Sequence, residues 1–120
     1  MSCFSSISIS LPSHRASTAD VLLAAQTWLG SESEEYARFD RFLSASNTQV
    51  RHFCVPAQEV VALRGPQDKA HIFEECALSL IEDAARKTLQ ANSFAPDAIQ
   101  GVVCTSCSCP LIPAIDDALS

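Results

Sequence analysis

Near the start of the chain, three apolar residues alternate with serines. Ile7, Ile9 and Leu11 recur at a period of two, which predicts a strand because successive side chains of a strand point to opposite faces. Pro12 follows and is expected to end this strand, since proline cannot donate a hydrogen bond to a neighbouring strand.

Later stretches repeat their apolar residues at helical spacing instead. A helix is predicted after Ser17 or Thr18, either of which can cap it, with Gly30 at its close. A second helix follows an acidic start at residues 31–47, and a short third is opened by Pro56 and closed at Gly65. The longest periodic stretch predicts a helix over about residues 67–91.

The remaining segments complete an alternating pattern. Residues 50–55 are expected to be irregular or extended, and the mostly apolar run 101–105 predicts a buried strand of the parallel type. This order favours a layered α/β architecture with a mixed sheet and helices. Two strands cannot cover the apolar stripes of these helices, so part of the fold is expected to be missing or supplied by another chain.

Composition narrows the classes of function. With 120 residues and 48% apolar residues, the chain fits one globular domain, which we assign to residues 1–120. A net charge of −6 argues against nucleic-acid binding, which relies on basic residues. The start resembles no secretory signal and no stretch suits a membrane span, so a cytoplasmic location with six reduced cysteines is expected.

Four blocks of sequence resemble the N-terminal part of type III polyketide synthases, the chalcone and stilbene synthase family. In chain order they read LPSH, RFDRFLSASNTQVRHF, HIFEECALSLIEDAARKTLQ and VVCTSCSCPLIPAIDDAL. The third is similar to the family's long helix, and the fourth to its strand and loop written "CTG--Pg-d--L". Together they span nearly all of this chain and about the first third of a family member.

The resemblance implies a thiolase-like fold, here an incomplete half-domain. Complete members are dimeric acyltransferases that condense an acyl-coenzyme A starter with malonyl-coenzyme A. They use a Cys-His-Asn set, in which the thiolate is acylated and the other two hold the thioester oxygen. The family places that Cys beyond the last matched block, so the resemblance implies truncation before the nucleophile-bearing helix and no catalytic residue here.

The resemblance also implies a coenzyme A site on Arg38 and Arg41, which match basic positions that hold its phosphates. Arginine suits this role because its planar fork matches phosphate oxygens. A third basic position of the cluster falls on Ala45. The alternative is a solvated helix face on which the arginines pair with Glu34 or Glu35.

The C-terminal loop carries the remaining matched positions. The resemblance places Cys107 and Ser108 at the reaction cavity, and Ile112 and Pro113 at a loop that reaches the partner subunit, where a cis bond is permitted. The alternatives are a buried inert thiol and an ordinary trans proline. A C-x2-C-x-C metal site is a further alternative, although a fourth ligand is absent. We assign no metal, no covalently bound cofactor and no catalysis by any histidine.

Two functions remain open from the sequence. The first is an N-terminal fragment of a type III polyketide synthase that is inactive alone and whose family substrates are coenzyme A thioesters. The second is a non-catalytic interaction protein that binds a full-length synthase or a complementary chain. Either allows a homodimer, and neither involves nucleic acid or a membrane.

Overall fold

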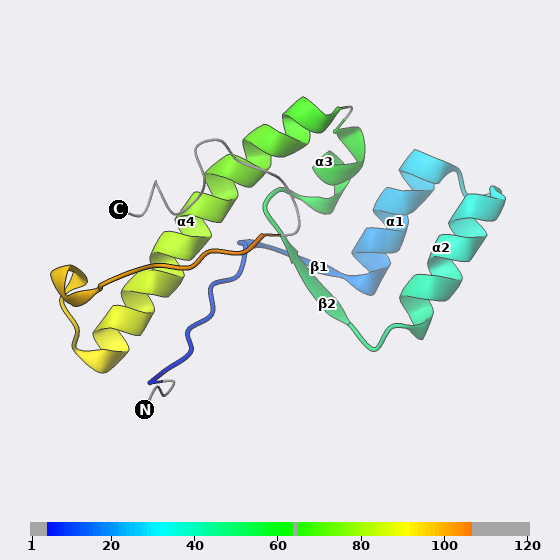
Figure 1. Ribbon diagram of the computed structural model, residues 1–120. Coiled ribbons are helices and arrows are strands. Elements are labelled where there is room, and N and C mark those ends of the chain that lie inside the picture. Colours follow the sequence, from blue (N-terminus) through cyan, green and yellow to red (C-terminus); the bar gives the residue numbers. More distant parts are fainter. Residues whose placement is uncertain (1–4, 64, 107–120) are drawn as a thin grey trace. The chain divides into compact units, whose positions relative to one another are not determined.

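The computed structural model describes residues 5–63 and 65–106. These residues form a mixed α/β structure with four α-helices, one short 3-10 helix and a two-stranded antiparallel sheet (Figure 1). The chain divides into two compact units, Pro12–Lys69 and a second made of Met1–Leu11 with Ala70–Ser120. We call them the hairpin unit and the long-helix unit.

The hairpin unit, named after the adjacent helices α1 (Thr18–Leu29) and α2 (Glu34–Ala45), combines three helices with a small sheet. Its other elements are β1 (His14–Ser17), β2 (Val50–Phe53) and α3 (Ala57–Ala62). The register of β1 and β2 joins His14 to Phe53. Helices α1 and α2 lie side by side (Figure 1), and α3 packs against α1. The predicted helices of this unit are confirmed, and the extended segment at residues 50–55 contains β2.

Helix α1 begins and ends at the residues that the sequence indicated. Ser17 is the N-cap, and its hydroxyl accepts a hydrogen bond from the Asp20 backbone N–H while Asp20 accepts from Ser17 in return. This reciprocal pair satisfies two backbone donors that the first turn otherwise leaves free. Gly30 closes the helix with φ of +82°, a backbone conformation that favours glycine.

Few side chains of the described residues are fully buried. The buried apolar residues are Ala16, Ala24, Ala25 and Leu43, all in the hairpin unit. Large apolar side chains remain open to solvent, with Trp28 exposed by 65% and Phe42 by 75%. Within the described residues, large apolar side chains of α1 and α2 therefore remain uncovered.

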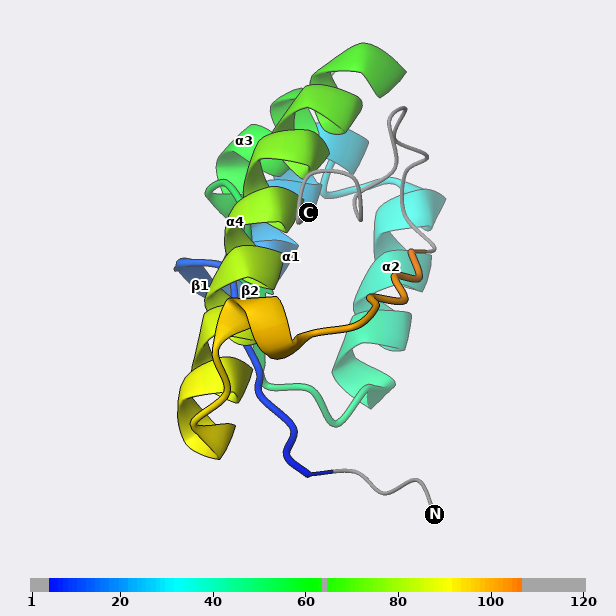
Figure 2. The same cartoon turned by 60° about the vertical axis from the view of Figure 1, so that its left-hand side comes forward.

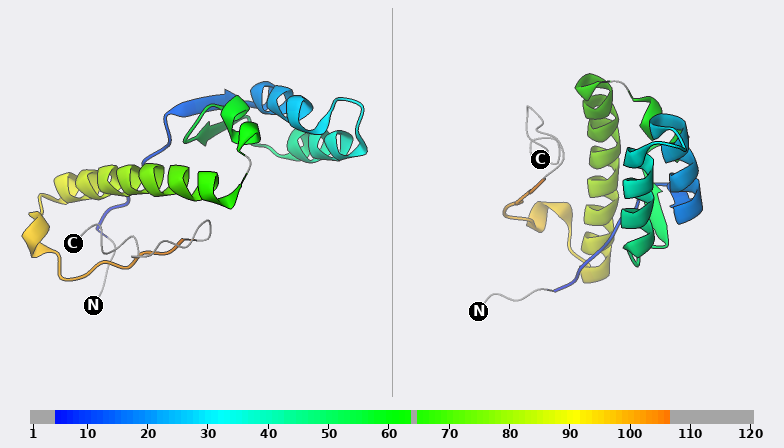
Figure 3. Two further views of the ribbon diagram at one scale, coloured as in Figure 1. Left: turned by 90° about the horizontal axis from the view of Figure 1, so that it is seen from above. Right: turned by 90° about the vertical axis from the view of Figure 1, so that its right-hand side faces the viewer.

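The long-helix unit is dominated by α4 (Pro66–Asn92), as Figure 2 shows, and the first residues of α4 belong to the hairpin unit. The predicted bounds of 67–91 are confirmed to within one residue at each end. Exposed i,i+4 ion pairs line α4, including Lys87 with Asp83 at 2.5 Å. A 3-10 turn (Pro96–Ala98) follows, and the next residues run back beside α4 (Figure 3). No described side chain of α4 is fully buried.

Two predicted strands are wrong. Residues 7–11 and 101–105 form no strand, and residues 101–106 are exposed rather than buried. A strand requires a neighbour to complete its hydrogen bonds, and among the described residues neither segment has one. The described sheet is the antiparallel β1–β2 pair alone. The alternating or apolar sequence of these two segments favours an extended backbone, but a strand also needs a second segment to pair with, and the described residues provide none.

Candidate functional site

Helix α2 carries the two arginines predicted to hold phosphates. Ser33 caps the helix, and its hydroxyl accepts a hydrogen bond from the Tyr36 backbone N–H at 3.0 Å. Arg38 and Arg41 follow on the next turns, and both are exposed. Because residues three apart on a helix are neighbours on its surface, the two guanidinium groups can approach one ligand.

Arg38 already has an acidic partner. Its Nη2 lies 3.2 Å from Oε1 of Glu34, one turn earlier, and the two side chains are 74% and 81% exposed. This is the pairing that the alternative interpretation of the arginines required. An exposed i,i+4 pair contributes only about 0.3–0.5 kcal/mol, so a phosphate can displace it at small cost.

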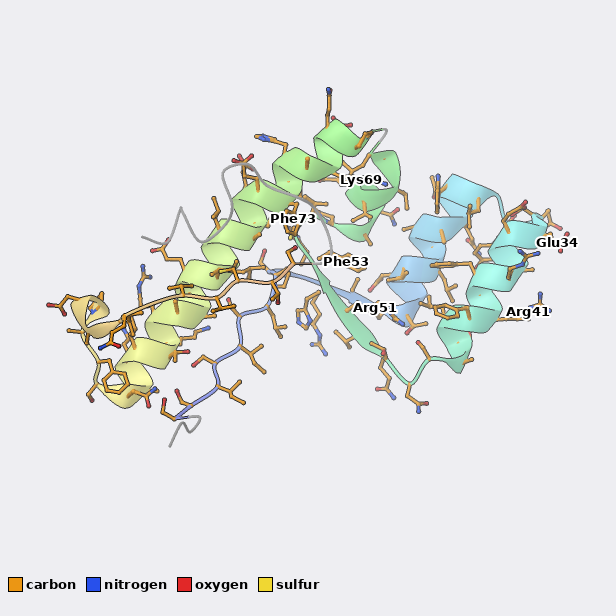
Figure 4. All side chains as sticks on the ribbon, in the orientation of Figure 1. Glu34, Arg41, Arg51, Phe53, Lys69 and Phe73 are labelled. Atoms are coloured by element: carbon orange, nitrogen blue, oxygen red, sulfur yellow. The ribbon has the colours of Figure 1, made fainter. Side chains whose placement is uncertain are left out.

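Arg41 makes no hydrogen bond or ion pair to another described residue. Figure 4 shows Arg41 and Glu34 on the side of α2 that faces away from α1. Ala45, at the third position of the expected cluster, is also exposed and lies one turn beyond Arg41. The structure therefore leaves the two cations accessible to a charged ligand, next to the carboxylates of Glu34 and Glu35 in the first turn of α2.

Arg51 has a structural role in the same unit. Its guanidinium donates to the Ser46 hydroxyl at 2.8 Å and to the Thr48 carbonyl at 3.0 Å, with a longer contact of 3.5 Å to the Thr18 hydroxyl. Ser46 caps the C-terminal end of α2, and Thr18 begins α1. Arg51 thereby ties β2 to the ends of both helices, in agreement with a structural interpretation of the Arg51-His52 pair.

An apolar groove lies beside this structural arginine, and the sequence analysis did not identify it. Its volume is about 390 Å³. It is lined by Val21, Ala24, Ala25, Trp28, Phe39, Phe42, Leu43, Arg51, Phe53, Ala57, Val60 and Val61. Trp28, Phe39 and Phe42 of this lining stand at helical spacing on α1 and α2, and periodicity alone does not tell a covered apolar stripe from an open one.

The other predicted site residues lie outside the described residues. These are Cys107, Ser108, Ile112 and Pro113. Cys104 is exposed, and Cys109 also falls outside, so the C-x2-C-x-C alternative stays a prediction. Among the described residues, no three His, Cys, Asp or Glu side chains are placed to hold a metal ion, and no helix is both long and apolar enough to cross a membrane.

Among the described residues, two carboxyl groups, those of Asp20 and Asp83, have a lowered pKa, and neither belongs to the arginine cluster. Hydrogen bonds from the side chain and backbone of Ser17 lower the pKa of Asp20. Hydrogen bonds from Lys87 and then Ser10 lower the pKa of Asp83. Both shifts favour the charged form through donors that stabilise the local fold.

Comparison with known proteins gives no assignment. The sequence matches no protein-family model and no curated protein.

Proposed function

We propose that this chain is the N-terminal part of a type III polyketide synthase with a thiolase-like fold. The observation that carries the proposal is the presence of four family-like blocks in the family's order. One block covers most of α2 and all of β2, and another lies within α4. The resemblance implies a helix in each of these two blocks, and α2 and α4 fit that; the strand that it implies at the start of the fourth block is not formed among the described residues.

The proposal gives the arginine face of α2 one task, which is to hold the phosphates of coenzyme A. Arg38 and Arg41 supply two guanidinium groups on one exposed side of the helix. Ala45 supplies no charge, so binding is expected to be weaker than with three cations. No matched residue corresponds to the family's Cys, His or Asn, and we assign these residues no catalysis of their own.

Titration of coenzyme A into the 120-residue chain tests the binding role. We expect saturable binding that weakens as salt is added, because the contacts are ionic and exposed. The double variant Arg38→Ala, Arg41→Ala should lose it. Arg15→Ala is the matched control, since Arg15 is an exposed arginine on β1 of the same unit. Absence of binding, or equal loss in the control, would contradict the assignment.

Incubation with a starter acyl-coenzyme A and malonyl-coenzyme A tests the absence of catalysis. The pure chain should form no condensation product, and mass spectrometry should find no acyl group on Cys107 or a neighbouring thiol. Covalent acylation of the isolated chain would contradict the view that the catalytic residues lie elsewhere.

A second candidate is a non-catalytic interaction protein that binds a full-length synthase or a complementary chain. The exposure of Trp28 and Phe42 at the apolar groove favours it. Large exposed apolar surfaces on small proteins commonly mark contact sites. Co-purification with a full-length synthase would support this function. A monodisperse monomer that unfolds cooperatively, with a midpoint that added synthase does not change, would count against it.

A further inference from the structure

We draw no further inference here: the strongest candidate, the apolar groove that α1, α2, β2 and α3 line in the hairpin unit, carries nothing beyond the second candidate function, because nothing in the described part of the chain shows what covers it.

Discussion

Removal of the Arg51 guanidinium should destabilise the hairpin unit by about 1–2 kcal/mol. Hydrogen bonds to a charged group contribute about 1.5–3 kcal/mol each when buried. Arg51 makes two good ones, to Ser46 and Thr48, and its third contact, to the Thr18 hydroxyl, is long at 3.5 Å. Arg51 is half-buried and its partners are half-buried or exposed, so water replaces much of what Arg51→Ala removes, and the total falls below the sum of two fully buried hydrogen bonds, to about 1–2 kcal/mol.

Urea unfolding measures this effect, with Trp28 fluorescence and far-UV circular dichroism as two probes. At a slope of about 1–3 kcal/mol per molar urea, a loss of ~1.5 kcal/mol lowers the midpoint by about 0.5–1.5 M. Arg51→Lys should recover only part of the lost free energy of unfolding, because a lysine ammonium cannot reach several acceptors at once as the planar arginine guanidinium does. The slope should stay unchanged.

Arg41→Ala is the matched control for this prediction. Arg41 is an arginine of the same unit that contacts no other described residue through a hydrogen bond or ion pair, and an exposed change of this kind costs less than about 0.5 kcal/mol. Equal midpoints for Arg51→Ala and Arg41→Ala would refute the view that Arg51 joins β2 to the helix ends.

Three further outcomes follow from other parts of the structure. Ser17→Ala should cost about 1 kcal/mol through loss of the α1 N-cap, seen as a lower thermal midpoint than that of the exposed-site variant Ser13→Ala. Lys87 and Ser10 lower the pKa of Asp83 from its ordinary 3.8, so the charged carboxylate stabilises the fold fully above pH 3.8 and loses this effect as the pH falls through the folded pKa. Asp83→Asn should therefore flatten the acid side of the curve of unfolding free energy against pH. An unchanged curve would contradict a contribution of Asp83 to stability. Ala45→Arg should tighten coenzyme A binding several-fold by restoring the third cation, whereas Ala62→Arg, on α3, should not.

Helices were predictable from this sequence because their signals are local. Ser17 with Asp20 and Gly30 set both ends of α1 within a few residues. Proline and glycine likewise marked the short helix and the start of α4. Each of these signals acts through the backbone nearby and needs no distant contact.

Strands were less predictable because pairing is not local. Residues 7–11 have the right alternation, and yet the described partner of their polar face is a helix, through Ser6 and Ser10. Of the two described strands, β1 covers the polar sequence His14–Ser17, and it forms because it pairs with β2, more than thirty residues later. The β-propensity of a segment predicts a strand poorly, because strand formation depends on the segment with which it pairs.

The candidate site was predictable in part. Arg38 and Arg41 lie on one exposed helix, as their spacing indicated. The apolar groove was not predicted, because Trp28 and Phe42 stand at the same helical spacing as buried residues would. They differ from buried residues only in that no other described part of the unit covers them. Coverage depends on the rest of the fold, which periodicity does not report.

The coding sequence downstream of the Ser120 codon tests the central claim most directly. If the chain is the first part of a type III polyketide synthase, the mature transcript should continue in frame through a cysteine-bearing helix and later a histidine and an asparagine at family spacing. A stop codon directly after Ser120, or a continuing frame without those three residues, would contradict the claim.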